Sequence, residues 1–254
     1  MLFLIIAIII LLMLVLWLAG AVFIMLNAGK YTFDTEKSKN TDYGDLKYIT
    51  DYIQNKEEDT LEIMVVPNSK IKDVILYFHG NSGRVPYIIS EASKFGTVIA
   101  PSYPGWGKSS GTPSSDKIYE TVDIVIQYLK ERKYNLSLVS VLGHSMGGSP
   151  SIYAGTKYPE LQKIVVVNTF YSMQAMCETK YSFFCILGGN FLNSAKYAPF
   201  VKTKYIQFNN VNDLLIPYEQ ASRLFEKIGR KDKKYFDIEG THGKFDITKV
   251  LSIN

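Results

Sequence analysis

The stretch that decides the fold reads Ser140-Val141-Leu142-Gly143-His144-Ser145-Met146-Gly147-Gly148. It joins an apolar, β-branched run to a helix-compatible segment, with the pattern G-x-S-x-G at the junction. A serine at such a strand–turn–helix junction lies in a strained turn, so its neighbours two positions away must lack side chains. Gly143 and Gly147 meet this requirement, and the free N–H groups of the following helix point toward Ser145. The stretch therefore predicts a nucleophile elbow with Ser145 as the nucleophile.

The composition excludes several other classes of protein. The chain has 254 residues, a formal net charge of +4 and scattered lysines, so it lacks the basic patch of a nucleic-acid-binding protein. Two cysteines, Cys177 and Cys185, are too few for a disulfide scaffold or a four-cysteine zinc site. The three histidines show no metal-binding spacing. We therefore expect no metal, no cofactor and no nucleic-acid partner.

The N-terminal residues form a segment long enough to cross a membrane. Leu2 to Leu26 carry no charge, and at about 1.5 Å per helical residue they span a hydrocarbon core of ~30 Å. A cleaved signal peptide is the alternative, because Ala19-Gly20-Ala21 resembles a cleavage site. However, no Lys or Arg precedes the run, and it exceeds the usual apolar core of a signal peptide. We predict a membrane anchor at residues 1–29, a stalk at 30–46 and a folded catalytic domain at 47–254.

The side of the membrane on which this domain lies stays open. Lys30, Lys37 and Lys39 follow the apolar run and favour a cytosolic domain. The sequon Asn135-Leu136-Ser137 favours the opposite side, although such a sequon is often accidental.

Apolar strands alternate with helical stretches from residue 47 onward. The pattern predicts an opening hairpin at 47–54 and 60–67, and later strands at 74–79, 97–101, 138–142, 163–167, 204–208 and 234–238. Helices are predicted at 86–95, 114–133, directly after the elbow, 218–228 and 244–253. This alternation predicts an α/β fold, a mostly parallel sheet with helices on both faces. Active sites of such sheets gather at the carboxyl ends of the strands.

A serine nucleophile needs a base, and the base needs a third group to orient it. His242 is the only histidine after Ser145 and follows the last predicted strand, so we predict it as the base. Asp213 follows the preceding strand and is the predicted acid, which gives the order serine, acid, histidine along the chain. The other two histidines, His79 and His144, are expected to be structural.

Other residues compete with Asp213 for the role of the acid. Some related architectures place the acid after the strand at 163–167, where this chain has Asn168 and Thr169, which cannot serve. Asp237 and Glu239 lie nearer His242 in the sequence, but they belong to the last strand or its immediate end. A turn or helix-capping role is the structural alternative for Asp213 itself.

The second half of the chemistry is an oxyanion hole, a set of N–H donors aimed where negative charge develops. One donor is predicted to be the backbone N–H of Met146, which follows the nucleophile. The second is expected in the glycine-flanked loop after the strand at 74–79. We assign the backbone N–H of Asn81, with Gly80 and Ser82 as alternatives.

Three motifs in the same chain make residues 60–250 resemble an α/β-hydrolase. They are His79-Gly80-Asn81, then Tyr103-Pro104-Gly105-Trp106-Gly107-Lys108-Ser109-Ser110-Gly111-Thr112-Pro113-Ser114, then Gly143 to Gly148. The combination is similar to a branch of small, often membrane-anchored serine hydrolases that includes protein depalmitoylases, serine-aminopeptidase-like and monoacylglycerol-lipase-like enzymes. That branch usually has a glycine-containing turn before its acid, where this chain has Asn209-Asn210-Val211-Asn212.

The segment 169–203 is rich in aromatic residues and methionine. In α/β-hydrolases such an insertion often forms a lid over the nucleophile, and its composition would suit an acyl chain. A helix and loop that fill the core is the alternative. Cys177 and Cys185 both lie here and could form a disulfide in an oxidising compartment.

The expected function is that of a membrane-anchored serine hydrolase that cleaves ester or thioester bonds through an acyl-enzyme. The bilayer is the expected partner, and it favours lipid, acylglycerol or S-acylated protein substrates because tethering raises their local concentration. A peptidase or small-ester hydrolase would use the same triad, and a non-catalytic hydrolase fold would serve binding. The oligomeric state stays open.

Overall fold

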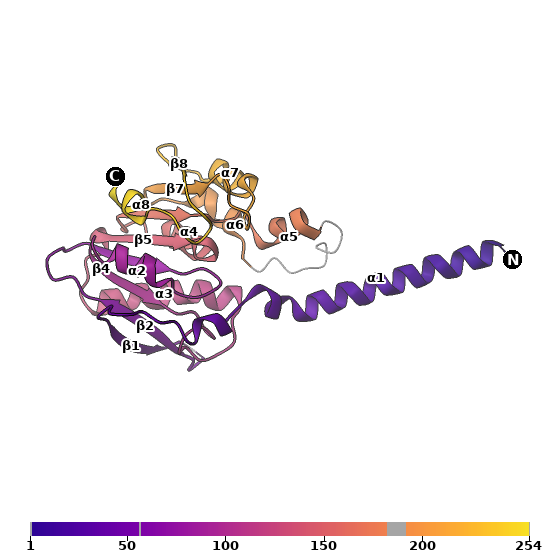
Figure 1. Ribbon diagram of the computed structural model, residues 1–254, viewed down its shortest axis with the longest axis horizontal. Coiled ribbons are helices and arrows are strands. Elements are labelled where there is room, and N and C mark those ends of the chain that lie inside the picture. Colours follow the sequence, from indigo (N-terminus) through magenta and orange to yellow (C-terminus); the bar gives the residue numbers. More distant parts are fainter. Residues whose placement is uncertain (1, 56, 182–191, 254) are drawn as a thin grey trace.

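The computed structural model describes residues 2–55, 57–181 and 192–253, which form an α/β domain and a long N-terminal helix (Figure 1). The strands are β1 (Ile49–Gln54), β2 (Thr60–Val66), β3 (Val74–Phe78), β4 (Thr97–Pro101), β5 (Val139–His144), β6 (Lys163–Val167), β7 (Tyr205–Asn210) and β8 (Lys234–Ile238). The α-helices are α1 (Leu2–Thr32), α2 (Pro86–Ala92), α3 (Ser115–Glu131), α4 (Gly148–Lys157), α5 (Met173–Tyr181), α6 (Ser194–Tyr197), α7 (Tyr218–Lys227) and α8 (Ile247–Ser252). Short 3-10 turns are η1 (Glu36–Ser38), η2 (Leu136–Leu138), η3 (Ser145–Gly147) and η5 (Ala198–Phe200).

The described strands form an eight-stranded sheet in the order β1-β2-β4-β3-β5-β6-β7-β8. β2 runs antiparallel to β1 and to β4, whereas the remaining neighbours pair in parallel. β5, which leads into Ser145, lies between β3 and β6 and is buried along its whole length. The predicted fold, a mostly parallel sheet, is thereby confirmed. We call the edge at which β3 to β8 end the site edge.

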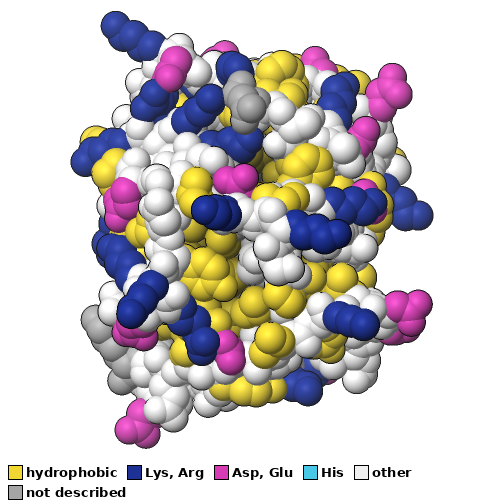
Figure 2. Space-filling model, turned by 90° about the vertical axis from the view of Figure 1, so that its left-hand side faces the viewer, with side chains coloured by type: hydrophobic (Ala, Val, Ile, Leu, Met, Phe, Trp, Pro, Cys, Tyr) yellow, Lys and Arg dark blue, Asp and Glu magenta, His cyan; other side chains and the backbone are white. Residues whose placement is uncertain are grey.

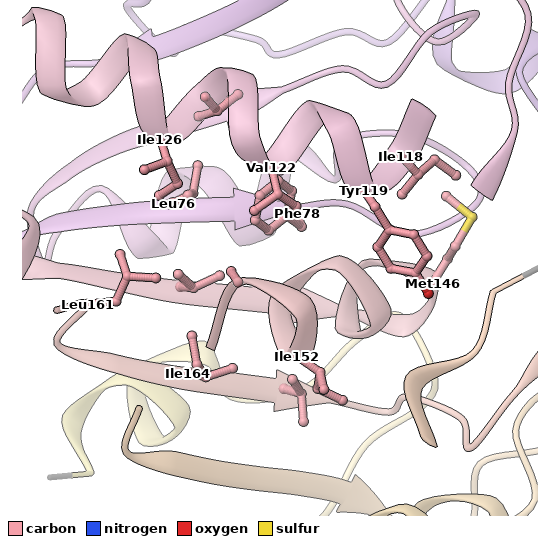
Figure 3. Packing of buried hydrophobic residues seen from close by; sticks show 14 of the residues in the cluster. Leu76, Phe78, Ile118, Tyr119, Val122, Ile126, Met146, Ile152, Leu161 and Ile164 are labelled. Atoms are coloured by element: carbon pink, nitrogen blue, oxygen red, sulfur yellow. The ribbon is translucent and has the colours of Figure 1, made fainter. Parts of the chain in front are cut away.

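Helices cover both faces of the sheet. One apolar cluster holds side chains of α3, α4 and α7 against the sheet, and a second holds side chains of α2 and α8 against the other face. Figure 3 shows part of the first cluster, in which Val122 and Ile126 of α3 lie near Leu76 and Phe78 of β3, with Met146 of the elbow at one end. The core therefore supports the elbow directly.

Two element boundaries differ from the predicted ones for local reasons. α8 begins at Ile247 rather than at residue 244, because the Asp246 side chain caps it by accepting the N–H of Lys249 at 3.0 Å. β7 continues to Asn210, two residues beyond the prediction, because Asn210 still pairs with Ile238 of β8. The acid loop that follows β7 therefore begins directly at Val211.

α1 is the one helix in the described part of the chain that is long and apolar enough to cross a membrane. Its stretch Leu2–Phe23 has 22 residues and a mean hydropathy of 3.4, and the most apolar part of this stretch is not buried against the domain. Figure 1 shows α1 projecting away from the domain.

The residues after α1, predicted as a stalk, pack on the domain. We call residues 33–38 the connecting segment. Phe33 is 5% exposed, and its ring meets the Trp106 ring edge-on at 5.5 Å between centroids. Ser38 is also buried, and its hydroxyl accepts the N–H of Gly107 at 2.9 Å. The polar composition predicts a stalk, but the burial of one aromatic side chain, Phe33, attaches this segment to the domain.

The described part of the predicted lid, 169–203, comprises α5, α6 and η5, while residues 182–191 lie outside the described residues. Phe170 and Leu192 are buried in the same cluster as Met146, and Met173 packs against that cluster. The described part therefore contributes to the core beside the elbow. The pairing of Cys177 with Cys185 falls on the residues that are not described.

Candidate active site

Ser145 lies at the tip of the elbow in a left-handed backbone conformation, with φ of +55°. For a residue with a side chain this conformation costs free energy, and in proteins it is typical of functional turns. A side chain at Gly143 would place its Cβ 2.3 Å from the Ser151 Oγ, and one at Gly147 would place it 2.0 Å from the Phe78 carbonyl oxygen. The two glycines therefore allow the close approach that the sequence pattern predicts.

The structure brings Ser145, His242 and Asp213 together in hydrogen-bonding order. The Ser145 Oγ lies 2.9 Å from Nε2 of His242, and Nδ1 of His242 lies 2.7 Å from Oδ2 of Asp213. An ionised carboxylate can only accept, so Nδ1 carries the proton and Nε2 is free to accept the proton of Ser145. These residues come from the loops after β5, β7 and β8, all at the site edge.

The Asp213 side chain is fully buried, and protein groups satisfy its carboxylate with hydrogen bonds. Its Oδ1 accepts the backbone N–H groups of Leu215 at 2.8 Å and Ile216 at 3.1 Å. Burial raises the pKa of Asp213, but the hydrogen bond with His242 and those from the two backbone N–H groups outweigh it and hold the pKa below its usual value. Asp213 is therefore a carboxylate at neutral pH, although the loop lacks the glycine that related enzymes carry.

The residues that compete for the acid role lie elsewhere. Asp237 lies within β8 and accepts the Tyr218 hydroxyl at 3.2 Å, and Glu239 is exposed to solvent. Thr169 donates its hydroxyl to the Ser145 carbonyl oxygen at 2.8 Å and so supports the elbow. Among the described residues, the hydrogen bond of Asp213 with His242 has no rival.

The backbone carbonyl of His242 is held by two side chains, a feature that sequence reasoning missed. His144 donates from Nε2 at 2.7 Å and Asn168 donates from Nδ2 at 3.0 Å, while Oδ1 of Asn168 accepts the N–H of Asn210 at 2.8 Å. Asn168 is buried and has a φ of +50°, which asparagine tolerates better than most residues. A buried asparagine directly after the Val-rich β6 is the signal that could have indicated this role.

His144 and His79 are buried and structural, as predicted. Burial, followed by the neighbouring His242, lowers the pKa of His144 to about 4, so the ring is neutral and donates its Nε2 proton. Burial lowers the pKa of His79 to about 3, and its Nδ1 donates to the carbonyl oxygen of Gly80 at 2.7 Å. The ring of His79 thereby fixes the start of the loop that follows β3.

The loop at residues 79–83 lies against the nucleophile. A Cβ built on Gly80 would lie 3.2 Å from the Ser145 Cβ. In Asn81, the side-chain oxygen accepts the N–H of Asp34 at 2.9 Å and the carbonyl oxygen accepts the indole N–H of Trp106 at 2.8 Å. The N–H of Asn81 donates to no group among the described residues. It therefore stays available as an oxyanion donor, and Met146 follows Ser145 directly in the chain.

No group of three or more His, Cys, Asp or Glu side chains that could hold a metal ion occurs among the described residues. The arrangement of the site is that of acyl transfer by a serine, with a base, an orienting carboxylate and nearby N–H groups.

Comparisons with known proteins identify the family and the fold. Residues 69–207, more than half of the chain, match the family model described as serine aminopeptidase, S33. An uncharacterized protein of Acanthamoeba polyphaga mimivirus is 26% identical and covers 75% of this chain and 74% of its own length. An uncharacterized membrane protein of Saccharomyces cerevisiae is also 26% identical and covers 82% of this chain and 76% of its own length.

Solved structures share the fold. The Pyrococcus furiosus esterase Pf2001 has a TM-score of 0.65 at 19% identity and covers 80% of this chain and 86% of its own chain. A puromycin-hydrolyzing peptidase of Mycobacterium tuberculosis has a TM-score of 0.66 at 16% identity and covers 84% of this chain and 38% of its own chain. At these identities the likeness establishes the fold, while the match to the family model establishes the family. The chain therefore belongs to the serine aminopeptidase S33 family of α/β-hydrolases.

Proposed function

We propose that this protein is a membrane-anchored serine hydrolase that cleaves ester or thioester bonds through an acyl-enzyme intermediate. The observation that carries the proposal is the chain of hydrogen bonds from Ser145 through His242 to Asp213, at 2.9 and 2.7 Å. The left-handed Ser145 at the elbow supports the same assignment, because this conformation presents the hydroxyl at the site edge.

In the proposed reaction the Ser145 Oγ attacks the carbonyl carbon while its proton moves to Nε2 of His242. The negative charge on the carbonyl oxygen is held by the N–H groups of Asn81 and Met146, and the positive charge on the imidazole is stabilised by Asp213. The tetrahedral intermediate expels an alcohol or thiol, which takes the proton from His242. Water, deprotonated by His242, then releases the acyl group from Ser145.

Two features support an acyl substrate that resides in a membrane. α1 supplies a 22-residue apolar stretch that we propose as the anchor, and tethering raises the local concentration of bilayer-resident esters. Met146 and Phe170 belong to one apolar cluster beside the elbow, and Met173 packs against it; such adaptable apolar side chains would suit an acyl chain. A lid over the site is our proposal for the segment 169–203, whose residues Phe170 and Leu192 are buried in the cluster that contains Met146.

A peptidase is the second candidate function, because the family description names an aminopeptidase and one structural neighbour hydrolyses puromycin. The same triad would cleave an amide. A hydrolase fold kept only for binding is the third, and the intact geometry of the triad argues against it.

The test is hydrolysis of p-nitrophenyl esters from acetyl to palmitoyl by the detergent-solubilised full chain and by the Ser145→Ala variant. The proposal predicts turnover that depends on Ser145 and favours long chains. Preference for aminoacyl anilides would favour the peptidase, and the absence of Ser145-dependent turnover on either series would favour the binding protein.

A further inference from the structure

The loop that carries the acid also exposes apolar side chains to solvent. Leu214 is 97% exposed, and Val211 and Leu215 are each about half exposed, although all three flank the fully buried carboxylate of Asp213. We call Val211, Leu214 and Leu215 the apolar tip. Single exposed leucines are common on protein surfaces, but a group of three beside a catalytic residue points to a function for the surface.

The apolar tip is held in this outward position by the acid itself. Oδ1 of Asp213 accepts the N–H groups of Leu215 and Ile216, and the N–H of Asp213 donates to the carbonyl oxygen of Asn210 at 3.1 Å. Ile216 is 2% exposed and anchors the far end of the loop in the core. Leu214 therefore cannot fold inward without breaking the hydrogen bonds that keep Asp213 ionised.

The end of α1 is attached to the same edge of the sheet. Phe33 packs against Trp106, the indole of Trp106 donates to Asn81, and the N–H of Asp34 donates to the side chain of Asn81. Asn81 lies in the loop after β3, and the apolar tip lies in the loop after β7; both strands are parallel, so both loops lie at the site edge. A bilayer crossed by α1 consequently begins at the edge where the apolar tip protrudes.

The opposite side of the domain carries apolar and charged side chains side by side. Figure 2 shows the side of the domain turned away from α1, where Lys and Arg side chains are scattered over the surface and no histidine is visible. Lys163 and Lys234 are the first residues of β6 and β8, which places them at the amino ends of these strands. His242 follows β8, which is parallel to β7, so it lies at the site edge.

We propose that the apolar tip docks on the lipid bilayer crossed by α1, with Leu214 and Leu215 inserted among the acyl chains at the interface. This inference rests on the proposed function and extends it, because Ser145 then faces the bilayer and takes its acyl substrate from the lipid phase. The occupant of the surface is the bilayer; a second copy of the chain or a soluble protein partner is an alternative that the experiment separates.

The docking test measures depth in the membrane and does not need catalysis. The full chain contains two tryptophans, Trp17 and Trp106, whose emission serves as the common background. Leu214→Trp is compared with Phe200→Trp in liposomes of phosphatidylcholine brominated on its acyl chains. Phe200 is 63% exposed. Ala198, two residues before it, accepts with its carbonyl oxygen the N–H of Gly229. Gly229 lies between the end of α7 and the start of β8, so Phe200 lies near the amino end of β8. It is therefore an exposed aromatic residue away from the site edge.

The proposal predicts that brominated lipid quenches the added emission of Leu214→Trp and leaves that of Phe200→Trp unquenched. The proposal would be overturned if iodide in the water quenched the added emission of Leu214→Trp and brominated lipid did not. If neither quencher reached the added tryptophan of Leu214→Trp and its emission varied with protein concentration, the proposal would also be overturned. A second copy of the chain would then cover the apolar tip.

A rate measurement tests whether docking on the bilayer affects turnover. Leu214→Ser should lower the ratio of turnover on a long-chain ester in liposomes to turnover on a soluble acetyl ester by about tenfold, because burial of one leucine is worth about that factor. Phe200→Ser is the control and should keep the wild-type ratio. Lipid quenching at position 214 without any Ser145-dependent turnover would refute the proposed function and leave the docking surface standing, so the two failures are distinguishable.

Discussion

The backbone N–H of Asp34 donates a 2.9 Å hydrogen bond to the side-chain oxygen of Asn81, which lies 47 positions later in the sequence. This bond joins the connecting segment, which follows α1, to the loop that lies against Ser145. The bond holds the side chain of Asn81 next to Gly80, at which a Cβ would lie 3.2 Å from the Ser145 Cβ. The segment that follows α1 is therefore joined to the loop of the proposed oxyanion hole.

Removal of this hydrogen bond should slow catalysis. Asp34→Pro eliminates the donor, and the loss of about 1 kcal/mol of positioning energy should lower kcat about fivefold. Asp34→Ala keeps the N–H and loses only an exposed ion pair with Lys37, so it is the matched control. The measurement is kcat and KM on a soluble ester, with the affinity for a trifluoromethyl ketone that forms an oxyanion on Ser145.

Asp34 acts as a positioning residue only if the effect is specific. A lower kcat and weaker ketone binding, with KM and the midpoint of thermal unfolding unchanged, would support this role. Parallel losses of kcat and thermal stability in both variants would mean that the segment is merely structural.

The Asp213→Asn substitution should nearly abolish turnover without unfolding the protein. The Asn oxygen can still accept the N–H groups of Leu215 and Ile216, but its amide would face Nδ1 of His242 and donate to it. The proton of the imidazole would then move to Nε2, so the ring could not accept the proton of Ser145. We expect kcat to fall by about 10⁴ on a p-nitrophenyl ester. A residual rate within tenfold of wild type would exclude Asp213 as the orienting acid.

The hydrogen bonds to the His242 carbonyl predict that a substitution at Asn168 lowers the stability of the protein strongly. Asn168→Ala removes one donor to that carbonyl, leaves the buried N–H of Asn210 without its acceptor and puts alanine at a φ of +50°. The free energy of unfolding should fall by about 2–4 kcal/mol. Asn168→Gly loses the same hydrogen bonds but fits the backbone, so it should recover about 1 kcal/mol. Chemical unfolding in detergent measures both, and equal stability of the two variants would contradict the backbone part of the argument.

The buried neutral histidines predict that stability falls as the pH falls below neutral. His79 and His144 have folded-state pKa values of about 3 and about 4, well below the unfolded value of about 6.5. Between these limits the unfolded chain binds more protons, so unfolding is favoured by up to about 1.4 kcal/mol per pH unit for each histidine. Asp213, whose folded pKa is lowered, adds a further loss only at pH values below about 4.

The measurement is the free energy of unfolding of the full chain in detergent at pH 7, 6 and 5. His144→Gln keeps a donor near the His242 carbonyl but cannot titrate, so its pH dependence should be about half as steep. A stability that stays constant from pH 7 to 5 would show that the two histidines take up protons in the folded state.

The local features of the sequence predicted much of the fold. The elbow, the strand ends and the order serine, acid, histidine have short-range signatures, because glycine spacing and apolar runs are properties of neighbouring residues. Ser145, Asp213 and His242 accordingly lie within hydrogen-bonding distance of one another.

The contacts that sequence reasoning missed join distant residues of ordinary composition. The sequence identifies Asn168 only as a residue that cannot serve as the acid, whereas its side chain donates to a carbonyl that lies 74 positions away. The connecting segment resembles a polar stalk, and only the tertiary position of Trp106 explains why Phe33 is buried. Such contacts have no local period or motif, so they follow from the packing of the whole domain.

The central claim is that Ser145 is an activated nucleophile in the folded protein. The most direct test is to treat the detergent-solubilised full chain with a fluorophosphonate and to locate the adduct by mass spectrometry. We expect one adduct on the peptide that contains Ser145, formed rapidly by the wild type and far more slowly by Asp213→Asn. Folded wild-type protein without an adduct on Ser145, or one that reacts at the same rate in both proteins, would contradict it.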